Sequence, residues 1–365
     1  MDYMARALAL ARQALGSTSP NPAVGAVVVR DGAVVGEGYT QPPGGPHAEV
    51  VALRQAGKLA RGATVYVTLE PCCHFGRTPP CTQALVGAGV RAVHAATLDP
   101  NPRVAGCGVQ ELRAAGLTVV VGEYEAEARE LNEAFLKHVT TGRPFLAVKF
   151  AMTLDGKIAT TNGHSRWVTG PEARHRVHEL RSTADAVLVG VGTVLADDPQ
   201  LTVRLAGSTA ARQPWRVVAD SHCCIPLGCR LLNDEYAERT IVATTPAAPP
   251  AALAAVRAKG AEALVLAARD GQVDLPGVLE MLASRGVINI LSEAGSTLTA
   301  ALFAFGLVDK VYAFVAPKVA GGGRAPTPVG GEGIASMDHA LPLQWRRVER
   351  LGDDLLLVAY PRAKE

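Results

Sequence analysis

The sequence predicts two consecutive α/β domains. Its 365 residues exceed the usual length of a single domain. Short β-branched runs alternate with segments of helical periodicity through both halves of the chain, which is typical of a layered α/β fold. Gly142-Arg143-Pro144 interrupts this alternation. We therefore predict a first domain over residues 1–143 and a second over 144–365.

The first domain is expected to begin with a helix over residues 2–15, where apolar residues recur at helical spacing until Gly16. The β-branched residues of 24–29 and 34–35 flank Asp31-Gly32, a dipeptide that favours a tight hairpin turn. The other predicted elements are a helix over 48–56, a strand over 64–69, a helix over 81–86, strands over 90–97 and 117–121, and a helical segment over 123–141.

In the second domain the same alternation starts again at Phe145. Strands are predicted over 145–150, 186–189, 216–219, 240–243, 264–267, 287–291, 311–315 and 355–360, and helices over 171–180, 278–283 and 295–305. No G-x-G-x-x-G motif follows the first strand of this domain, so a Rossmann-type nucleotide fold is not supported.

Composition excludes several classes of function. The formal net charge is only +2, and no basic run is interleaved with aromatic residues, so we expect no nucleic-acid partner. No apolar run approaches the roughly 20 residues of a membrane span. Seven cysteines in so long a chain suit a reducing compartment rather than a disulfide framework. The N-terminal residues lack the pattern of a secretory signal. We expect a soluble cytoplasmic protein.

One group of residues indicates a metal site: His47-Ala-Glu49, then Pro71-Cys72, then Cys81. One His and two Cys can bind zinc tetrahedrally and leave the fourth position for water. Glu49, free of the metal, would move protons between water and a departing amine. We predict His47 and Cys72 each at a helix start, where the partial positive charge favours thiolate.

The spacing of the two cysteines departs from the general base-deaminase pattern. Eight residues separate Cys72 from Cys81, where that pattern has two. Cys73 is the alternative third ligand, although it does not directly follow Pro71. Cys107 lies outside this group of residues, and we interpret it as structural.

Three segments resemble one known family, the bifunctional riboflavin-biosynthesis deaminase/reductases. They are Ser19-Pro-Asn-Pro-Ala-Val-Gly25, Gly45-Pro-His-Ala-Glu49 and Thr68-Leu-Glu-Pro-Cys-Cys-His-Phe-Gly-Arg-Thr-Pro-Pro-Cys81. The resemblance extends over about residues 2–360. It implies a cytidine-deaminase-like three-layer α/β/α domain followed by a dihydrofolate-reductase-like α/β domain. The implied substrate is a small-molecule pyrimidine ribosyl phosphate, 2,5-diamino-6-ribosylamino-4(3H)-pyrimidinone 5′-phosphate.

The resemblance also implies residues of the deaminase pocket. Asn21 would hydrogen-bond the pyrimidine, His74 and Arg77 would reach the bound nucleotide, and Asp99 and Asn101 would close the pocket. A guanidinium at Arg77 suits phosphate. Asp99-Pro-Asn101-Pro is equally a good turn sequence, which is an alternative reason for these residues.

Two glycine-containing turns in the second domain favour phosphate binding. Gly190, Gly192 and Thr193 follow a predicted strand, and Gly295-Ser-Thr297 follows another, so backbone N–H groups are available at helix starts. Glycines at such turns also occur for steric reasons alone.

The resemblance implies that this domain binds NADPH and reduces the ribosyl group to ribityl. The implied cofactor residues are Ala151, Trp167, Thr193, Asp197, Ser221, Gly295, Ser296, Thr297, Leu298, Thr299, Ala300 and Ala301, and the implied substrate residues are Ser165, Arg181, Leu201, Arg204 and Glu293. The sequence names no general acid, because Asp197 and Glu293 are candidates by polarity only. Cys223, Cys224 and Cys229 lack a suitable fourth ligand, and we interpret them as structural.

Three rival interpretations stay open. The second domain could have lost reduction and serve only binding or assembly. The chain could be a nucleoside or tRNA deaminase with an appended domain, or a non-catalytic zinc protein. The intact reductase motifs argue against a domain that has lost reduction. The long gap between the cysteines argues against a nucleoside or tRNA deaminase, and the free Glu49 argues against a non-catalytic zinc protein. We also expect a homo-oligomer.

Overall fold

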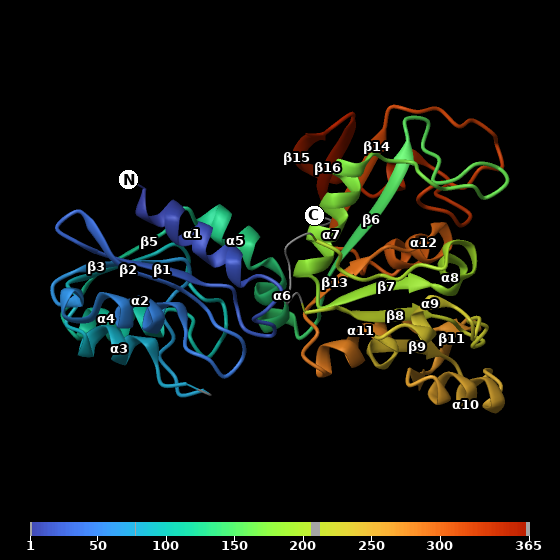
Figure 1. Ribbon diagram of the computed structural model, residues 1–365. Helices are drawn as coiled ribbons and strands as arrows, with labels where there is room; N and C mark the ends of the chain where they lie inside the picture. The colour runs from blue at the N-terminus through green and yellow to red at the C-terminus, as the bar shows by residue number, and fades with distance from the viewer. Residues whose placement is uncertain (1, 77, 206–211, 363–365) are drawn as a thin grey trace. The chain divides into compact units, whose positions relative to one another are not determined.

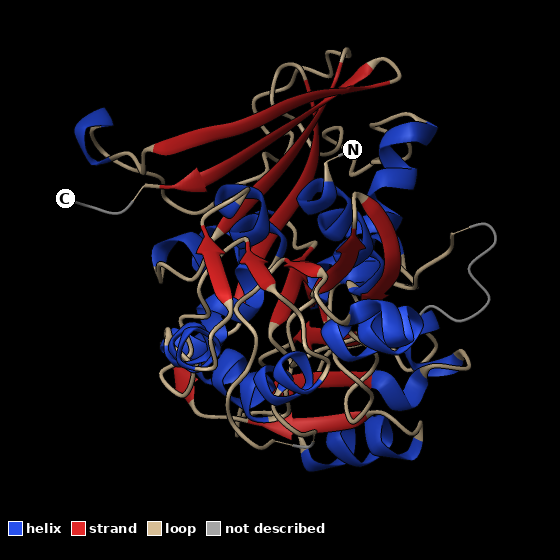
Figure 2. Ribbon diagram, turned by 90° about the vertical axis from the view of Figure 1, so that its left-hand side faces the viewer, coloured by secondary structure: helices blue, strands red, loops and turns tan. Residues whose placement is uncertain are grey.

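The computed structural model describes residues 2–76, 78–205 and 212–362. The chain forms two compact units, Met1–Arg143 and Pro144–Glu365, which we describe separately. Both units are layered α/β structures (Figure 1), built from helices and strands throughout (Figure 2).

The first unit is built on a five-stranded sheet in the order β2-β1-β3-β4-β5. The β2-β1-β3 pairs are antiparallel and the β3-β4-β5 pairs are parallel. The strands are β1 (Gly25–Arg30), β2 (Ala33–Tyr39), β3 (Thr64–Val67), β4 (Ala92–Ala95) and β5 (Thr118–Val121). The helices are α1 (Tyr3–Ala14), α2 (Ala48–Ala56), η1 (Gly57–Ala60), α3 (Cys81–Gly87), α4 (Cys107–Ala114), α5 (Glu125–Leu131) and α6 (Glu133–Thr141).

Helices cover both faces of this sheet, as the three-layer prediction requires. Apolar residues of α1 and α5 pack with β1 on one face. Helices α2, α3 and α4 lie on the other face (Figure 1). The layered α/β class predicted for the first domain is confirmed.

Helix α2 approaches the sheet very closely because glycines face it. A Cβ at Gly36 would lie 2.2 Å from the Ala52 carbonyl oxygen, and a Cβ at Gly38 would lie 2.5 Å from that of Ala48. These contacts are shorter than any real Cβ tolerates, so backbone meets backbone here. The N-terminus of α2, which carries His47, is fixed against β2 as a result.

The second unit is built on a nine-stranded sheet in the order β10-β9-β8-β7-β13-β6-β14-β16-β15. The strands from β10 to β14 run parallel, and β16 and β15 complete the sheet in antiparallel pairs. The strands are β6 (Phe145–Thr153), β7 (Ala186–Gly190), β8 (Trp215–Ala219), β9 (Thr240–Thr244), β10 (Glu262–Val265), β13 (Asn289–Ser292), β14 (Lys310–Ala316), β15 (Leu343–Leu351) and β16 (Asp354–Pro361), with a small separate pair of β11 (Ala268–Arg269) and β12 (Gln272–Val273).

Helices connect most of the parallel strands of this sheet. They are α7 (Pro171–Thr183), α8 (Val191–Asp197), α9 (Arg230–Asn233), η2 (Ala237–Arg239), α10 (Pro250–Ala258), α11 (Leu275–Ser284), α12 (Ser296–Ala304) and η3 (Met337–His339). Alternate residues of the central strands enter different apolar clusters: Leu188 packs on one face and Val187 and Val189 on the other. Burial on both faces explains why these strands read as continuous apolar runs.

The prediction that Cys72 begins a helix is wrong. Cys72 lies in an irregular segment, and the helix begins at Cys81, with Pro80 as its N-cap. The eight-residue insertion contains Gly76, Pro79 and Pro80, which do not favour a helix interior. Pro71 therefore lies outside any helix.

Other differences concern helices and a strand that were not predicted correctly from the sequence. The helical segment predicted over 123–141 is two helices, interrupted at Asn132, whose side chain instead pairs with the Ala23 backbone N–H and C=O at 2.8 and 2.9 Å. Helix α4 and strand β15 were not predicted. Strand β15 is exposed along most of its length, so it lacks the alternation that marks a half-buried strand.

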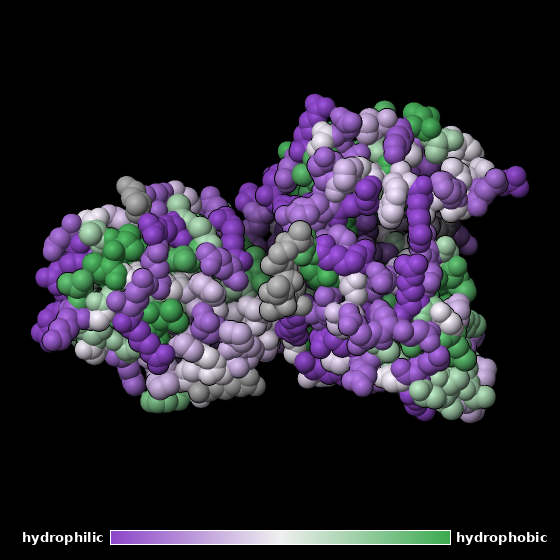
Figure 3. Space-filling model, in the orientation of Figure 1, coloured by the Kyte–Doolittle hydropathy of each residue, from purple (hydrophilic) through white to green (hydrophobic). Residues whose placement is uncertain are grey.

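No helix in the described ranges is both long enough and apolar enough to cross a membrane. The face seen in Figure 3 is mainly hydrophilic, with hydrophobic residues in small groups.

Candidate active sites

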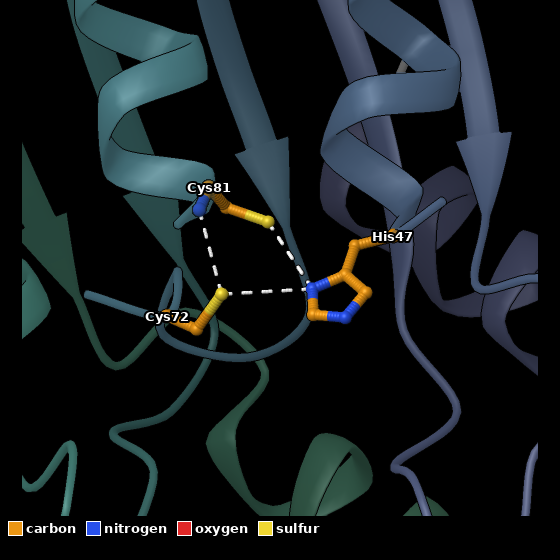
Figure 4. A group of neighbouring side chains, drawn as sticks. All are labelled: His47, Cys72 and Cys81. Atoms are coloured by element: carbon orange, nitrogen blue, oxygen red, sulfur yellow. Dashed lines mark hydrogen bonds between the residues drawn. The ribbon is translucent and has the colours of Figure 1, made fainter. Parts of the chain in front are cut away.

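Three metal-ligating side chains converge in the first unit from separate segments. His47 is the N-cap of α2, and Cys81 is the first residue of α3. Cys72 precedes the loop that leads to Cys81 (Figure 4). The His47 Nδ1 atom lies 3.6 Å from the Cys72 Sγ and 3.3 Å from the Cys81 Sγ. All three donor atoms lie within 4.8 Å of one another.

These separations fit a tetrahedral zinc ion. Zinc bonds of about 2.3 Å to sulfur and about 2.0–2.1 Å to nitrogen place the two donors about 3.6 Å apart at the tetrahedral angle. The observed N–S distances of 3.6 and 3.3 Å are close to that value. Among the described residues three donors converge, which is the number of protein ligands in a catalytic rather than a structural zinc site.

The orientation of His47 also suits a ligand. Its Nδ1 faces both sulfurs, so its Nε2 must carry the proton when Nδ1 binds a metal. Nε2 lies 3.2 Å from the Thr78 hydroxyl oxygen, which can accept that proton's hydrogen bond. Such a partner fixes the tautomer of a metal-binding histidine. Sequence reasoning missed Thr78, and its place between the two cysteines was the available signal.

Before a metal binds, the pKa values of the Cys72 and Cys81 thiols are shifted in opposite directions. Hydrogen bonds from the Cys81 thiol and then from His47 lower the pKa of Cys72 to about 4, against the opposing effect of burial. The Cys81 backbone N–H also donates to the Cys72 Sγ at 3.4 Å. The pKa of Cys81 is raised, first by its bond to Cys72 and then by burial. The site thus presents a ready thiolate to a metal.

Glu49 lies on the first turn of α2, two residues after His47, and is only 3% exposed. Burial, followed by the nearby Cys72, raises its pKa to about 7. A carboxyl group with a pKa near neutrality can both accept and release a proton.

The residues predicted for the deaminase pocket lie on loops of this unit. Asp99 is 6% exposed, and burial raises its pKa to about 6. Its Oδ1 accepts a hydrogen bond from the Asn101 backbone N–H at 2.8 Å, so both belong to one turn. The buried Nδ1 of His74 has no hydrogen-bond partner within the described residues. Asn21 donates its backbone N–H to the Thr18 carbonyl oxygen. Arg77 lies outside the described residues.

In the second unit the predicted site residues gather at one edge of the sheet. Strands β6, β7, β8 and β13 are parallel, so their carboxyl ends share an edge. Ala151 lies in β6, Thr193 follows β7, Ser221 follows β8, and Glu293 directly follows β13. This is the edge at which open parallel sheets bind ligands.

The two phosphate-receptive turns are neighbours at this edge. A Cβ at Gly295 would lie 3.5 Å from the Thr193 hydroxyl oxygen, and a Cβ at Gly190 would lie 3.6 Å from the Leu298 Cβ. Gly190 caps α8 and Gly295 caps α12, and neither cap has a side-chain hydrogen bond. Leading backbone N–H groups of α8 and α12 are thus available to an anion.

The other predicted cofactor residues, and the predicted substrate residue Ser165, have the following contacts. The Ser165 hydroxyl donates to the Asp197 carboxylate at 3.0 Å. Trp167 is exposed and lies under the Arg174 guanidinium. The Ser221 hydroxyl is engaged by Gln272 and the Val273 backbone. The remaining predicted residues, Ser296, Thr297, Leu298, Thr299, Ala300 and Ala301, form the first turns of α12.

A buried charge cluster lies beside them. Arg181 pairs with Glu293 through two hydrogen bonds of 2.5 and 2.9 Å, and both side chains are about 10% exposed. Lys149 places its Nζ 3.9 Å from the same carboxylate. Burial alone would raise the pKa of Glu293, but Arg181 and then Lys149 lower it to about 2. The carboxylate is therefore ionised at neutral pH.

Lys149 and His178 are site residues that sequence reasoning did not assign. Burial lowers the pKa of Lys149, and Glu293 partly opposes that shift. Burial, then Arg181 and Arg204, lower the pKa of His178 to about 4, so its ring is neutral at pH 7. Lys149 lies on β6 and meets Glu293 because β6 is the neighbour of β13 in the sheet.

The two remaining predicted substrate residues differ in exposure. Arg204 is exposed and donates to Gln200 and Thr202 side chains at 3.0 Å each. Leu201 is 2% exposed and packs in an apolar cluster, so any contact with substrate would come from its backbone.

Comparisons with known proteins assign a family domain to each unit. Residues 1–97 match the cytidine and deoxycytidylate deaminase zinc-binding region, and residues 144–357 match the RibD C-terminal domain. The riboflavin biosynthesis protein RibD of Actinobacillus pleuropneumoniae is 45% identical over 357 residues, covering 98% of this chain and 94% of its own. The chain belongs to the RibD family of riboflavin biosynthesis proteins.

Other members of the family extend this similarity to the whole fold. RibD of Aquifex aeolicus is 46% identical, covering 98% of this chain and 97% of its own. The solved structure of Acinetobacter baumannii RibD has a TM-score of 0.87 at 39% identity and covers 99% of this chain and 98% of its own. A Thermotoga maritima deaminase/reductase has a TM-score of 0.84 at 36% identity, covering 99% and 98%. The predicted family, the fold class and the pairing of zinc deaminase with NADPH-dependent reductase are confirmed.

Cys81→Ser should sharply lower the zinc content of the purified protein, because one thiolate of a three-ligand set is lost. The matched control is Cys73→Ser, a neighbouring cysteine outside the converged group, which should keep a full complement of zinc. Metal analysis of both variants checks this. Normal zinc in Cys81→Ser with zinc loss in Cys73→Ser would exchange the roles of the two cysteines.

Glu293→Gln should lower the free energy of unfolding of the second unit by about 3 kcal/mol, because it leaves buried cations without their partner. The carboxylate has a folded pKa below its ordinary value, so its stabilisation is complete above about pH 4.5 and is lost as pH falls toward 2.

Denaturant unfolding at pH 7 and at acid pH measures this effect. The control is Glu262→Gln, which removes an exposed bidentate pair with Arg285 in the same unit and should cost below about 1 kcal/mol. Equal costs for both variants would show that burial does not strengthen the Glu293 pair.

Proposed function

We propose that the first unit deaminates 2,5-diamino-6-ribosylamino-4(3H)-pyrimidinone 5′-phosphate and that the second reduces 5-amino-6-(5-phosphoribosylamino)uracil with NADPH. The convergence of His47, Cys72 and Cys81 beside a buried Glu49 carries the first assignment. The Thermotoga maritima relative is described as a deaminase of the first kind and a reductase of the second. The order follows from the chemistry, since the product of deamination is the substrate of reduction.

In the deamination step, water replaces the 2-amino group and ammonia leaves. Zinc held by the three ligands would lower the pKa of a water in the fourth position toward neutrality. Glu49 would pass a first proton from the attacking water to the ring nitrogen, and a second proton from the added hydroxyl group to the departing amine. His74, Asp99 and Asn101 would hold the pyrimidine in place, with Asn21 and Arg77 as further predicted contacts.

In the reduction step, the ribose-derived C1′ receives a hydride and the ring oxygen receives a proton, which leaves a ribityl chain. NADPH would supply the hydride. The turns at Gly190 and Gly295 would hold its phosphates. Arg181, with Arg204, would attract the substrate phosphate, and the ionised Glu293 would hold the ammonium of Lys149 in place as a candidate proton donor. Neutral His178 adds no charge to this region at pH 7.

The rivals raised by the sequence receive less support. A second unit that had lost reduction would have no reason to keep the buried Lys149–Glu293–Arg181 cluster at the ligand-binding edge of the sheet. A nucleoside or tRNA deaminase would not need that unit. We also infer a cytoplasmic location, which fits the seven free cysteines.

Glu49→Gln should retain zinc and lose ammonia release by at least about a hundredfold, because general acid–base groups contribute on that scale. Ammonia and NADPH absorbance are followed together on the diaminopyrimidine ribosyl phosphate. Wild-type protein should release ammonia before it consumes NADPH, and the variant should still consume NADPH when given the deaminated intermediate.

Other outcomes separate the hypotheses. Ammonia release without NADPH consumption by wild-type protein would support the deaminase-only rival. If wild-type protein neither releases ammonia nor consumes NADPH, a nucleoside or tRNA substrate would be indicated instead. Normal ammonia release by Glu49→Gln would remove Glu49 from the mechanism.

We further propose that a second copy of the chain covers one face of the second unit. A hollow of about 340 Å³ on the sheet face opposite α7 is lined mostly by apolar residues of β6, β14, β15 and β16, Trp345 among them. Strand β15 ends the sheet, so within the described part of the chain one of its edges has no partner strand. Edge-to-edge pairing of two copies would satisfy that edge and cover Trp345, which is 62% exposed.

Trp345→Glu should therefore weaken self-association by more than about tenfold, as expected for a buried aromatic anchor at an interface. Sedimentation velocity over a concentration series measures this. Leu227→Glu, an exposed apolar residue elsewhere in the same unit, is the control and should leave association unchanged. A wild-type protein that stays monomeric at all concentrations would contradict the proposal.

A further inference from the structure

Glu70 is a buried acidic residue that the deaminase mechanism does not use. It lies two residues before Cys72 and is 3% exposed. Its carboxylate accepts three hydrogen bonds, all from backbone N–H groups: Asp99 at 3.1 Å and Gly106 at 3.0 Å on Oε2, and Val109 at 3.0 Å on Oε1. A buried carboxylate with this many donors is strongly held.

These donors belong to two different segments. Asp99 begins the turn that contains Asn101, and Gly106 and Val109 belong to the start of α4. The Glu70 backbone N–H donates in addition to the Thr97 carbonyl oxygen at 2.9 Å. One side chain thus connects the segment that carries a metal ligand, the turn predicted to close the substrate pocket, and a helix.

The contact between α4 and the metal-carrying segment is too close for any larger residue. A Cβ at Gly108 would lie 2.1 Å from the Pro71 carbonyl oxygen and 3.2 Å from the Glu70 Oε1. On the far side of this contact, the Cys73 Sγ lies 3.9 Å from the Arg103 carbonyl oxygen. Pro71 and Cys73 flank Cys72, so the residues on both sides of this ligand contact the 103–108 segment, Pro71 through its carbonyl oxygen and Cys73 through its sulfur.

A simple helix cap would explain only part of this arrangement. The bonds to Gly106 and Val109 satisfy N–H groups at the start of α4, as an N-cap does. The bond to Asp99 serves no helix. It holds the backbone of a residue whose side chain is buried and whose pKa is raised by that burial, within a turn closed by Asn101. The position of the turn therefore depends on the same carboxylate that lies beside the metal-binding segment.

We propose that Glu70 is a positioning residue of the deaminase site, which holds the Asp99–Asn101 turn in register with the metal ligand Cys72. The inference rests on the proposed deaminase function. Supporting groups behind metal ligands typically change metal affinity or activity by about 10–100-fold when they are removed. A group that also holds the substrate turn should raise the KM as well.

The test compares Glu70→Gln with Glu111→Gln in the full-length, zinc-loaded protein. Glutamine keeps the size of Glu70 but turns an NH₂ group toward backbone donors. Glu111 lies on α4 and accepts a hydrogen bond from the Thr82 hydroxyl of α3 at 2.9 Å, and among the described residues it bonds to none of the 98–101 turn, so it reports on the contact between α4 and α3 without the turn. Ammonia release is measured without NADPH, and reduction of the supplied deaminated intermediate reports on the second unit.

Glu70→Gln should raise the KM for ammonia release by about tenfold or more, speed zinc loss to a chelator, and speed amide hydrogen exchange over residues 97–109. Glu111→Gln should change none of these by more than about twofold, and reduction should be unchanged in both variants. Glu70→Asp, which keeps the charge but retracts it, should fall between Glu70→Gln and the wild type. It replaces Glu70→Gln in the comparison if the latter does not fold.

The outcomes distinguish this inference from the proposed function. A Glu70→Gln protein with wild-type KM and wild-type exchange over 97–109 overturns the inference, even if its zinc content or turnover number falls. If wild-type protein itself releases no ammonia, the proposed function fails, and hydrogen exchange and zinc retention still decide whether Glu70 couples the two segments.

Discussion

The deaminase site depends on the close packing of α2 against the β1–β2 hairpin. Because Gly36 and Gly38 have no side chains, the helix backbone rests on the strand backbone, and the helix start cannot move relative to the sheet. His47 and Glu49 both belong to that helix start. The imidazole and the carboxyl group therefore keep a fixed relation to each other and to the thiols that approach from α3 and the preceding loop.

A buried glutamate has a raised pKa in the first unit and a lowered pKa in the second. Around Glu49 desolvation, followed by the nearby Cys72, outweighs the opposing effect of His47 and raises the pKa to about 7, which suits a group that must exchange protons. Around Glu293 the same loss of water is outweighed by Arg181 and Lys149, so the carboxylate stays ionised and serves as a fixed charge. The partners, rather than the depth of burial, decide which carboxyl group can carry a proton.

The two sites also differ in how their residues are assembled. The reductase residues stand at the carboxyl ends of parallel strands, so the sheet alone brings them to one edge. The deaminase residues stand on loops and helix starts that the sheet orders only indirectly. Such loops need bonds of their own, and the side chains of Asn132 and Glu70 supply them by pairing with backbone groups far away in the sequence.

The sequence by itself predicted the two α/β domains, the candidate metal ligands, Glu49 and the glycine turns, because each depends on residue type and short spacing. It also predicted the helix that begins at Cys81, but it wrongly placed Cys72 at a helix start, where the structure has an irregular segment.

Only the tertiary structure decided which distant groups meet. Lys149 reaches Glu293 because β6 and β13 are neighbours in the sheet, and Thr78 reaches His47 because an insertion folds back over the metal site. Strand β15 could not be predicted from hydrophobic periodicity, because it is exposed along most of its length. Contacts between residues far apart in the chain are set by packing, and a local pattern carries no information about them.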